Sequence, residues 1–275
     1  MASSVSADNA DSAFTGTLPD IYARLLVPLL FEDYAEDVAR DAAMTFPARI
    51  LETAAGTGVV TRAMAQVLPA ARLTATDLNP GMIGAAAASG TASDAVIWEQ
   101  ADAQSLPFPD ASFDVVVTAF GAMFFPDRIG AYREAHRVLA PGGRMVLSVW
   151  DRLPRNPLPE AISDALMELG FEEAAGFVHR VPFAYDDPRR IREELDAAGF
   201  HEVQIRTVAH LTRPSSARDA AIAHVQGTPT FNHVEAARRG SAADVSEAVA
   251  EFLSDRFGPD PIRAGMSALV VTATA

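Results

Sequence analysis

A short glycine-containing stretch, with an acidic residue just before it, is the part of this sequence best suited to hold a ligand. It reads ETAAGTG and contains Glu52, Gly56 and Gly58. Glycine lets the backbone turn tightly, and it lets a ligand approach because no side chain is in the way. A second carboxylate, Asp77, ends the next apolar run, at residues 72–77. These residues predict a loop that binds a small ligand.

The elements on either side of the loop must position it. Ile50 and Leu51 indicate a buried strand before the loop, and residues 59–65 indicate a helix after it. A dinucleotide-binding fingerprint needs a third glycine at the position where this chain has Thr61. The strand, the loop and the helix therefore predict a binding site, but they do not identify its ligand.

The spacing E-x-x-x-G-x-G, followed by Asp77, resembles motif I of the class I S-adenosylmethionine (SAM)-dependent methyltransferases. The resemblance implies that Glu52 and the loop containing Ala54, Gly56 and Gly58 cradle the methionine part of SAM. It also implies that Asp77 binds the ribose hydroxyl groups. A carboxylate suits that task because it accepts two hydrogen bonds at once.

Two later segments extend the resemblance. Residues 77–82 resemble the family pattern D-x-[NS]-x-x-M, which implies that Met82 packs near the adenine ring and that Leu78 also contacts the cofactor. Residues 101–108, ADAQSLPF, resemble G-D-A-x-x-L-P-F. That similarity implies that Asp102 accepts a hydrogen bond from the adenine amino group and that the backbone N–H of Ala103 donates to a ring nitrogen. Taken alone, Asp102 is explained equally well as the cap of a loop.

A fourth predicted strand, at residues 112–119, leads into a loop that in the family runs beneath the sulfonium group. The resemblance makes Ala119 and Phe120 neighbours of the cofactor and Phe124 a candidate contact of the acceptor. The competing interpretation is that Phe124 packs against the next helix. Residues 137–143, RVLAPGG, resemble the family's R-V-L-x-P-G-G and predict a helix end and a turn before a strand at 145–150.

The order of these elements indicates an α/β fold. The resemblance implies a Rossmann-like sheet of seven strands with the last strand antiparallel, helices on both faces and helical lid insertions. The sixth and seventh strands are expected at 202–209 and 268–273. We expect a mobile tail at 1–19, lid helices at 20–46 divided or kinked at Pro28, and a methyltransferase domain at 47–275 with lid insertions at about 151–185 and 214–258.

Several residues of the predicted lid could serve the site. Tyr22 and Tyr34 are candidates to line it, although an aromatic residue on an amphipathic helix is more often part of the core. An oxygen or carbon nucleophile would need a base to remove its proton. His224 and His233 are the candidates for that base, although each histidine alone is more often structural.

Composition limits the partners. The 275 residues carry a net charge of −14, with 22 basic against 36 acidic residues, which argues against a nucleic-acid partner. No apolar run is long enough for a membrane span. The absence of cysteine excludes thiolate metal sites and fits a reducing interior, so we expect a cytoplasmic protein. No cluster has metal-ligand spacing, so no metal is expected. The sequence leaves open whether the chain forms a homodimer.

Three functional hypotheses follow. The first is a SAM-dependent methyltransferase that acts on a small-molecule acceptor and releases S-adenosylhomocysteine. The motifs of this chain resemble those of the small-molecule methyltransferases similar to the enzymes of ubiquinone and menaquinone biosynthesis. The second is an NAD-dependent oxidoreductase, against which Thr61 and the Asp102-Ala103 segment speak. The third is a SAM-binding protein without transfer activity, which would carry the same cofactor motifs.

Overall fold

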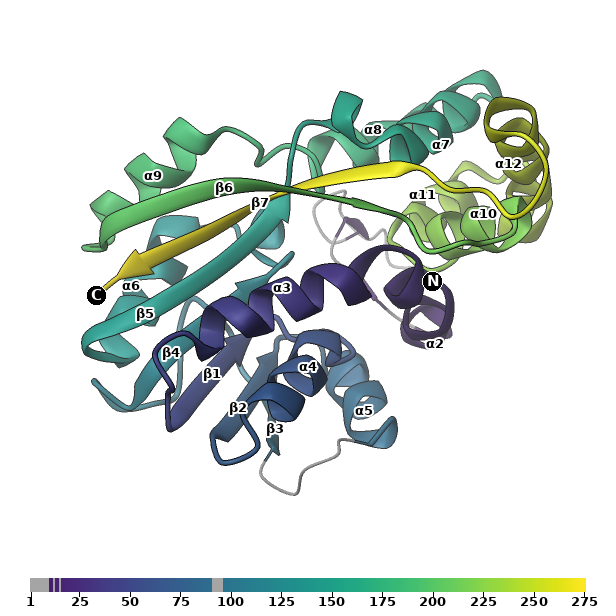
Figure 1. Ribbon diagram of the computed structural model, residues 1–275. Helices are drawn as coiled ribbons and strands as arrows, with labels where there is room; N and C mark the ends of the chain where they lie inside the picture. Colours follow the sequence, from purple (N-terminus) through teal and green to yellow (C-terminus); the bar gives the residue numbers. More distant parts are fainter. Residues whose placement is uncertain (1–9, 12, 15, 91–95) are drawn as a thin grey trace, which may run out of the picture. The chain divides into compact units, whose positions relative to one another are not determined.

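The computed structural model describes residues 10, 11, 13, 14, 16–90 and 96–275 (Figure 1). Contacts divide the chain into two compact units. The sheet unit consists of Glu32–Asp151, Tyr185–Val208 and Ser267–Ala275, and the helical unit of Met1–Phe31, Arg152–Ala184 and Ala209–Met266. Neither unit is therefore a continuous stretch of sequence.

Seven strands form one sheet in the order β3-β2-β1-β4-β5-β7-β6. Strands β1 to β5 pair in parallel, and β7 pairs antiparallel with β5. The prediction of seven strands with the last one reversed is confirmed. The strands are β1 (Arg49–Thr53), β2 (Arg72–Asp77), β3 (Val96–Gln100), β4 (Phe113–Ala119), β5 (Leu139–Trp150), β6 (His201–Leu211) and β7 (Gly265–Thr274).

The central strands are apolar on both faces because helices cover both sides of a parallel sheet. Ile50 and Leu51 of β1 and Val115, Val116 and Val117 of β4 are fully buried. Apolar residues of α3 and α4 pack together against one face of these strands (Figure 1). The helices of the sheet unit are α3 (Glu32–Ala43), α4 (Val59–Val67), α5 (Pro80–Ala88), the 3-10 helix η2 (Ala122–Phe124), α6 (Arg128–Val138) and α9 (Pro188–Ala197).

Strand β5 begins earlier than the sequence pattern predicts. The pattern indicates a turn at residues 141–143 and a strand from 145. In the structure Leu139 already pairs with Phe113, and the register shifts before Arg144 pairs with Val115. The Pro-Gly-Gly residues therefore form an irregular part of the strand and do not end the pairing.

The helical unit contains both predicted insertions and the segment around Pro28. Pro28 lies inside a π-helix and does not divide the segment, because the helical backbone continues from α2 through this π-helix into α3. Within the described residues, no helix combines the length and apolar character needed to cross a bilayer. The helices are α2 (Leu18–Ile21), the π-helix η1 (Tyr22–Phe31), the 3-10 helix η3 (Leu153–Arg155), α7 (Pro157–Glu168), α8 (Glu172–Arg180), α10 (Ala217–Val225), α11 (Thr230–Ala237) and α12 (Ala242–Phe257).

The described part of the segment predicted as a tail makes specific contacts within the helical unit. Asp11 binds Arg180 through two hydrogen bonds of 2.9 and 3.0 Å. The side-chain amide of Asn232 donates to the carbonyl oxygens of Ala10 and Ala13. These bonds attach the start of the described chain to α8 and α11.

Candidate functional site

The predicted ligand-binding residues of the sheet unit follow the carboxyl ends of four neighbouring strands. The glycine loop follows β1, Asp77 ends β2, Asp102 follows β3 and Phe120 follows β4. The chain order reverses between β1 and β4, and ligands of open α/β sheets bind outside the strand ends at such a switch point. The structure thus brings these side chains to the same edge of the sheet.

Asp77 joins the second strand to the glycine loop. Its Oδ2 accepts a hydrogen bond of 2.8 Å from the backbone N–H of Gly56, and its Oδ1 accepts one of 2.8 Å from the backbone N–H of Asn79. Burial raises the pKa of Asp77, against the lowering effect of these two hydrogen bonds. Asn79 in turn caps α5, as the sequence predicts, by accepting from Gly81 and Met82.

Glu52 lies inside the sheet unit, with 2% of its surface exposed. The hydroxyl of Thr61 donates to its Oε2 at 2.5 Å. Burial raises the pKa of Glu52 to about 8, although the bond from Thr61 and the charge of Arg62 act in the opposite direction. The carboxyl group is therefore largely protonated at neutral pH. Thr61, which occupies the position of the third glycine of a dinucleotide-binding fingerprint, is the hydrogen-bond partner of Glu52.

Two residues at this edge that are not glycine adopt a left-handed backbone. Ala54 after β1 has a φ of 53°, and Phe120 after β4 has a φ of 51°. Such conformations are strained for residues with a side chain, and they concentrate at functional sites. Gly121 packs directly against Ala54. Two of the strained positions in the described chain therefore lie at the ends of β1 and β4, where the sequence predicts cofactor contacts.

Phe120 also belongs to an aromatic cluster with Tyr34 and Trp150. The rings of Phe120 and Trp150 have centroids 4.2 Å apart, and Tyr34 contacts both edge to face. Tyr34 is 1% exposed, so in the sheet unit it is part of the core. Trp150, at the carboxyl end of β5, is a neighbour of the site that sequence reasoning missed. Its only signal was an aromatic residue at a strand end.

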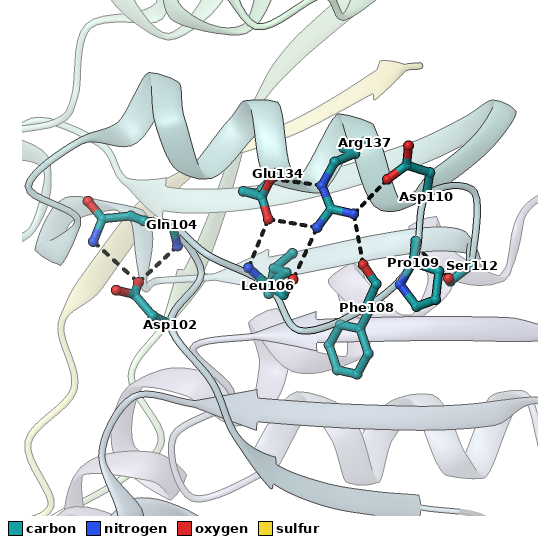
Figure 2. A network of polar contacts seen from close by, with 9 residues as sticks. All are labelled: Asp102, Gln104, Leu106, Phe108, Pro109, Asp110, Ser112, Glu134 and Arg137. Carbon is teal, nitrogen blue, oxygen red and sulfur yellow. Dashed lines mark hydrogen bonds and ion pairs between the residues drawn. The ribbon is translucent and has the colours of Figure 1, made fainter.

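The loop after β3 holds Asp102 in a tight turn (Figure 2). Its Oδ1 accepts from the backbone N–H of Gln104 at 2.8 Å and from the side-chain amide of Gln104 at 3.2 Å. Ala103 is buried, as is Met82, whereas Leu78 is 63% exposed. These bonds agree with the simpler interpretation of Asp102 as the cap of a loop. Both go to Oδ1, and no hydrogen bond between described residues reaches Oδ2.

Four predicted residues of the acceptor side and the lid remain. Phe124 lies in η2 of the sheet unit, whereas Tyr22 lies in the helical unit with its ring against those of Phe14 and Phe31. His224 and His233 also belong to the helical unit, on α10 and α11. Among the described residues, no group of acidic and histidine side chains is arranged to hold a metal ion.

The two histidines differ in their bonding. His224 is buried, and its Nδ1 is 2.9 Å from the carbonyl oxygen of Ala220, so Nδ1 carries the proton and donates. Burial lowers the pKa of His224 to about 4, and its Nε2 has no partner among the residues the structure describes. His233 instead places its Nε2 2.7 Å from Asp11. The Nε2 of His224 is thus without a partner among the described residues, whereas the Nε2 of His233 is paired with Asp11.

The residues at the strand ends fit a nucleoside cofactor with an amino-acid tail. A Cβ added to Gly56 would meet no atom within 4 Å, so the loop has open space on this side. The hydroxyl of Thr57, in the same loop, is buried and has no partner among the described residues. Asp77 lies beside the loop, and each of its carboxylate oxygens has a further lone pair with which it can accept a hydrogen bond. Open backbone, an unpaired hydroxyl and a carboxylate are therefore gathered at one place.

Comparison with known proteins gives one family. The methyltransferase-domain family matches residues 51–147. A demethylmenaquinone methyltransferase of Deinococcus radiodurans is 31% identical over 196 residues, which are 66% of this chain and 79% of the relative. A malonyl-[acyl-carrier protein] O-methyltransferase of Hahella chejuensis is 30% identical over 211 residues, 68% of this chain and 75% of the relative.

Solved structures share the fold at low sequence identity. Phosphoethanolamine N-methyltransferase 2 of Haemonchus contortus, solved with S-adenosyl-L-methionine, has a TM-score of 0.60 and 15% identity. The match covers 99% of this chain and 60% of that one. The seven-stranded sheet with its reversed last strand is thus the sheet of class I methyltransferases.

Proposed function

The chain belongs to the class I SAM-dependent methyltransferases, and from this premise we propose that it binds SAM at the carboxyl ends of β1 to β4 and methylates a small-molecule acceptor. The observation that carries the proposal is the hydrogen bond from Gly56 to Asp77, which joins the two central cofactor motifs beside open backbone. SAM itself supplies the electrophilic methyl group and the leaving group. The protein's task is therefore to bind and orient.

Each part of the cofactor would meet a different group of residues. The glycine loop, with Ala54, Gly56 and Gly58 and with Glu52 beneath it, would hold the methionine part, and Asp77 would accept from the ribose hydroxyls. Asp102 and the Ala103 N–H would bind the edge of the adenine, with Leu78 and Met82 against the ring. Ala119 and Phe120 would lie next to the reacting group. The open space at Gly56 supports this assignment because the loop can be approached closely there.

The strained backbone supports the same location. Ala54 and Phe120 keep left-handed conformations that cost about 1–3 kcal/mol each in proteins generally. Structure around them must hold this strain, and the Phe120 N–H donates to the carbonyl oxygen of Ser148 at 2.8 Å. Rigid positioning of this kind is what in-line methyl transfer requires, because the nucleophile must be held close to the methyl carbon.

For the acceptor we propose a small molecule with an oxygen, nitrogen or carbon nucleophile. The relatives act on a demethylmenaquinone and on a malonyl-acyl-carrier protein, so the family accepts more than one kind of nucleophile. His224 is the better of the two candidate bases, since its Nε2 lone pair is unpaired among the described residues and His233 is engaged by Asp11. With its lowered pKa, His224 is better suited to accept a hydrogen bond from the nucleophile than to hold a proton.

Titration calorimetry with S-adenosylhomocysteine and with NADH tests the cofactor assignment. We expect micromolar binding of the former and none of the latter. Binding of NADH alone would reject the assignment of SAM as the cofactor. Incubation of the binding-competent protein with methyl-labelled SAM and a panel of quinols, phenols and amines then separates an enzyme from a protein that only binds SAM. Labelled product supports the enzyme, and its absence across the panel favours the binding protein.

A further inference from the structure

The loop after β3 is attached to α6 at two places, and Figure 2 shows the attachment at Glu134 and Arg137. Near the start of α6, the side-chain oxygen of Gln104 accepts a 2.9 Å hydrogen bond from the backbone N–H of Asp127. In the last turns of the helix, Glu134 and Arg137 bind the backbone at Leu106. The loop that carries Asp102 is thus bound near both ends of α6.

Arg137 uses its whole guanidinium group for this purpose. Its Nη1 donates to the carbonyl oxygen of Phe108 at 2.7 Å and to Asp110 at 2.8 Å. Its Nη2 donates to the carbonyl oxygen of Leu106 at 3.0 Å, and Nη2 and Nε both donate to Glu134. A guanidinium group has five N–H donors in a fixed fork, and all of them are used here. A lysine could not reproduce this set.

Glu134 completes the hold on the loop. Its Oε2 accepts a 2.9 Å hydrogen bond from the backbone N–H of Leu106, while Arg137 binds the carbonyl oxygen of the same residue. Hydrogen bonds from Arg137 lower the pKa of Glu134, so the carboxylate is ionised at neutral pH. Both polar backbone groups of Leu106 are therefore fixed by charged side chains of α6.

We call the contacts of Gln104, Glu134 and Arg137 that attach the loop to α6 the brace, and within it Gln104 binds Asp102 directly. Its backbone N–H and its side-chain amide both donate to Oδ1 of Asp102, while its side-chain oxygen faces Asp127. No hydrogen bond within the described residues reaches Oδ2 of Asp102. One carboxylate oxygen is therefore held by the protein, and the other is available as an acceptor.

We propose that Gln104 and Arg137 are positioning residues for recognition of the adenine ring. By fixing the loop to α6, they hold Asp102 so that its Oδ2 accepts from an exocyclic amino group and opposes an oxo group at the same position. The inference rests on the proposed function, in which Asp102 binds the adenine amino group. It adds that the selectivity depends on the attachment to α6.

The test compares two ligands that differ along one edge of the purine: the exocyclic group changes from amino to oxo, and the neighbouring ring nitrogen changes from an acceptor to an N–H donor. S-Adenosylhomocysteine carries an amino group on the purine, and S-inosylhomocysteine carries an oxo group there. Calorimetry gives the ratio of their dissociation constants for the full-length wild type and for Gln104→Met, Arg137→Met, Arg137→Lys and Asp102→Asn. Arg133→Met is the matched control, because Arg133 lies on the same helix and its guanidinium binds the Ala197 carbonyl oxygen instead of the loop.

The wild type should prefer the amino ligand by roughly tenfold or more, as expected for a hydrogen bond to a charged group. Asp102→Asn should reduce this preference to the part that the Ala103 N–H contributes, because an amide can donate to the oxo group. Gln104→Met and Arg137→Met should reduce the ratio several-fold, Arg137→Lys should fall between them and the wild type, and Arg133→Met should leave it unchanged.

Three results would contradict the proposal, and they differ in what they reject. If Asp102→Asn loses the preference while Gln104→Met keeps it, Asp102 recognises the amino group but does not need Gln104 to position it. If both ligands weaken equally in Gln104→Met and Arg137→Met, the brace only stabilises the fold. If the wild type shows no preference, the assignment of Asp102 to adenine fails first. Gln104→Met keeps the test decisive should Arg137→Met not fold.

Discussion

Gly58 faces the indole ring of Trp98 so closely that a Cβ built on it would lie 2.4 Å from the ring atom Cη2. Gly58 also has a left-handed φ of 79° at the start of α4. Gly56, two residues earlier, has a φ of 55° but open space around its missing side chain. The two glycines of one motif therefore meet different demands: packing requires Gly58, and access to the loop requires Gly56.

Gly58→Ala should destabilise the fold. The added methyl group would clash with Trp98, and overpacking of this kind costs about 1–3 kcal/mol, to which the left-handed backbone adds about 1–2 kcal/mol. Urea denaturation measures the loss. Placing Gly58→Ala in a Trp98→Leu background should recover the part due to the clash. An alanine variant as stable as wild type would show that Trp98 moves aside freely.

Gly56→Ala should keep most of the stability and lose cofactor affinity. The methyl group meets no protein atom, so only the backbone cost of about 1–2 kcal/mol is expected. It does occupy the space that the cofactor needs, so binding of S-adenosylhomocysteine should weaken at least tenfold in calorimetry. Unchanged affinity in a folded variant would mean that the open side of the loop does not face the ligand.

Asp77→Ala should weaken S-adenosylhomocysteine binding by roughly 1–3 kcal/mol, through the loss of hydrogen bonds to a carboxylate. Asp114 offers a matched control, because its carboxylate also accepts two backbone N–H groups, those of Ala48 and Arg49, but at the amino ends of β1 and β4 instead of the carboxyl ends. Asp114→Ala should therefore reduce stability without changing affinity. Equal effects of the two variants on binding would remove Asp77 from the site.

Glu52→Gln should change how stability depends on pH. The pKa of Glu52 rises from an ordinary 4.5 to about 8 on folding, so the folded state binds a proton that the unfolded state has released. Wild-type stability should therefore fall as pH rises through this window, by roughly 3–5 kcal/mol in total. The glutamine variant lacks this slope, which urea unfolding at several pH values would reveal. Glu134→Gln is the control, since the pKa of Glu134 is lowered and should contribute no slope above about pH 6.

His224→Leu should flatten the acid side of the stability profile. Burial lowers the pKa of His224 from 6.5 to about 4, so the unfolded state takes up a proton first as the pH falls. The wild type should lose roughly 2–4 kcal/mol of unfolding free energy between these pH values from this residue, and the variant should not. Parallel profiles for the two proteins would show that His224 is accessible to water and not buried as a neutral imidazole.

Motif order was enough to predict that the residues of the proposed site lie at one edge of the sheet. Glu52, Gly56, Asp77 and Asp102 each follow or end an apolar run, and parallel strands bring such ends together. The reversed last strand was expected from family resemblance, and its pairing with β5 confirms it. These features depend on local pattern and strand order, which a sequence contains.

The partners that hold those residues could not be predicted in the same way. The contacts of Trp98 with Gly58, of Thr61 with Glu52, and of Gln104 with Asp102 and the backbone of Asp127 each join groups that only the folded chain brings together. No periodicity encodes them. Pro28 shows the same limit, because a proline that breaks an ordinary helix is accommodated in a π-helical segment.

The contact between Ala54 and Gly121 makes two distant positions behave as one. A Cβ on Gly121 would lie 2.4 Å from the Cβ of Ala54, so a side chain is accommodated at one position only while the other has none. Over evolutionary time substitutions at the two positions should therefore be correlated. Alanine at 121 should be tolerated where residue 54 is glycine and should destabilise the fold where residue 54 is alanine. In directed evolution the two positions should be randomised together. One substitution at a time can reach glycine at 54 with alanine at 121 only through the variant that has glycine at both positions, because alanine at both would clash.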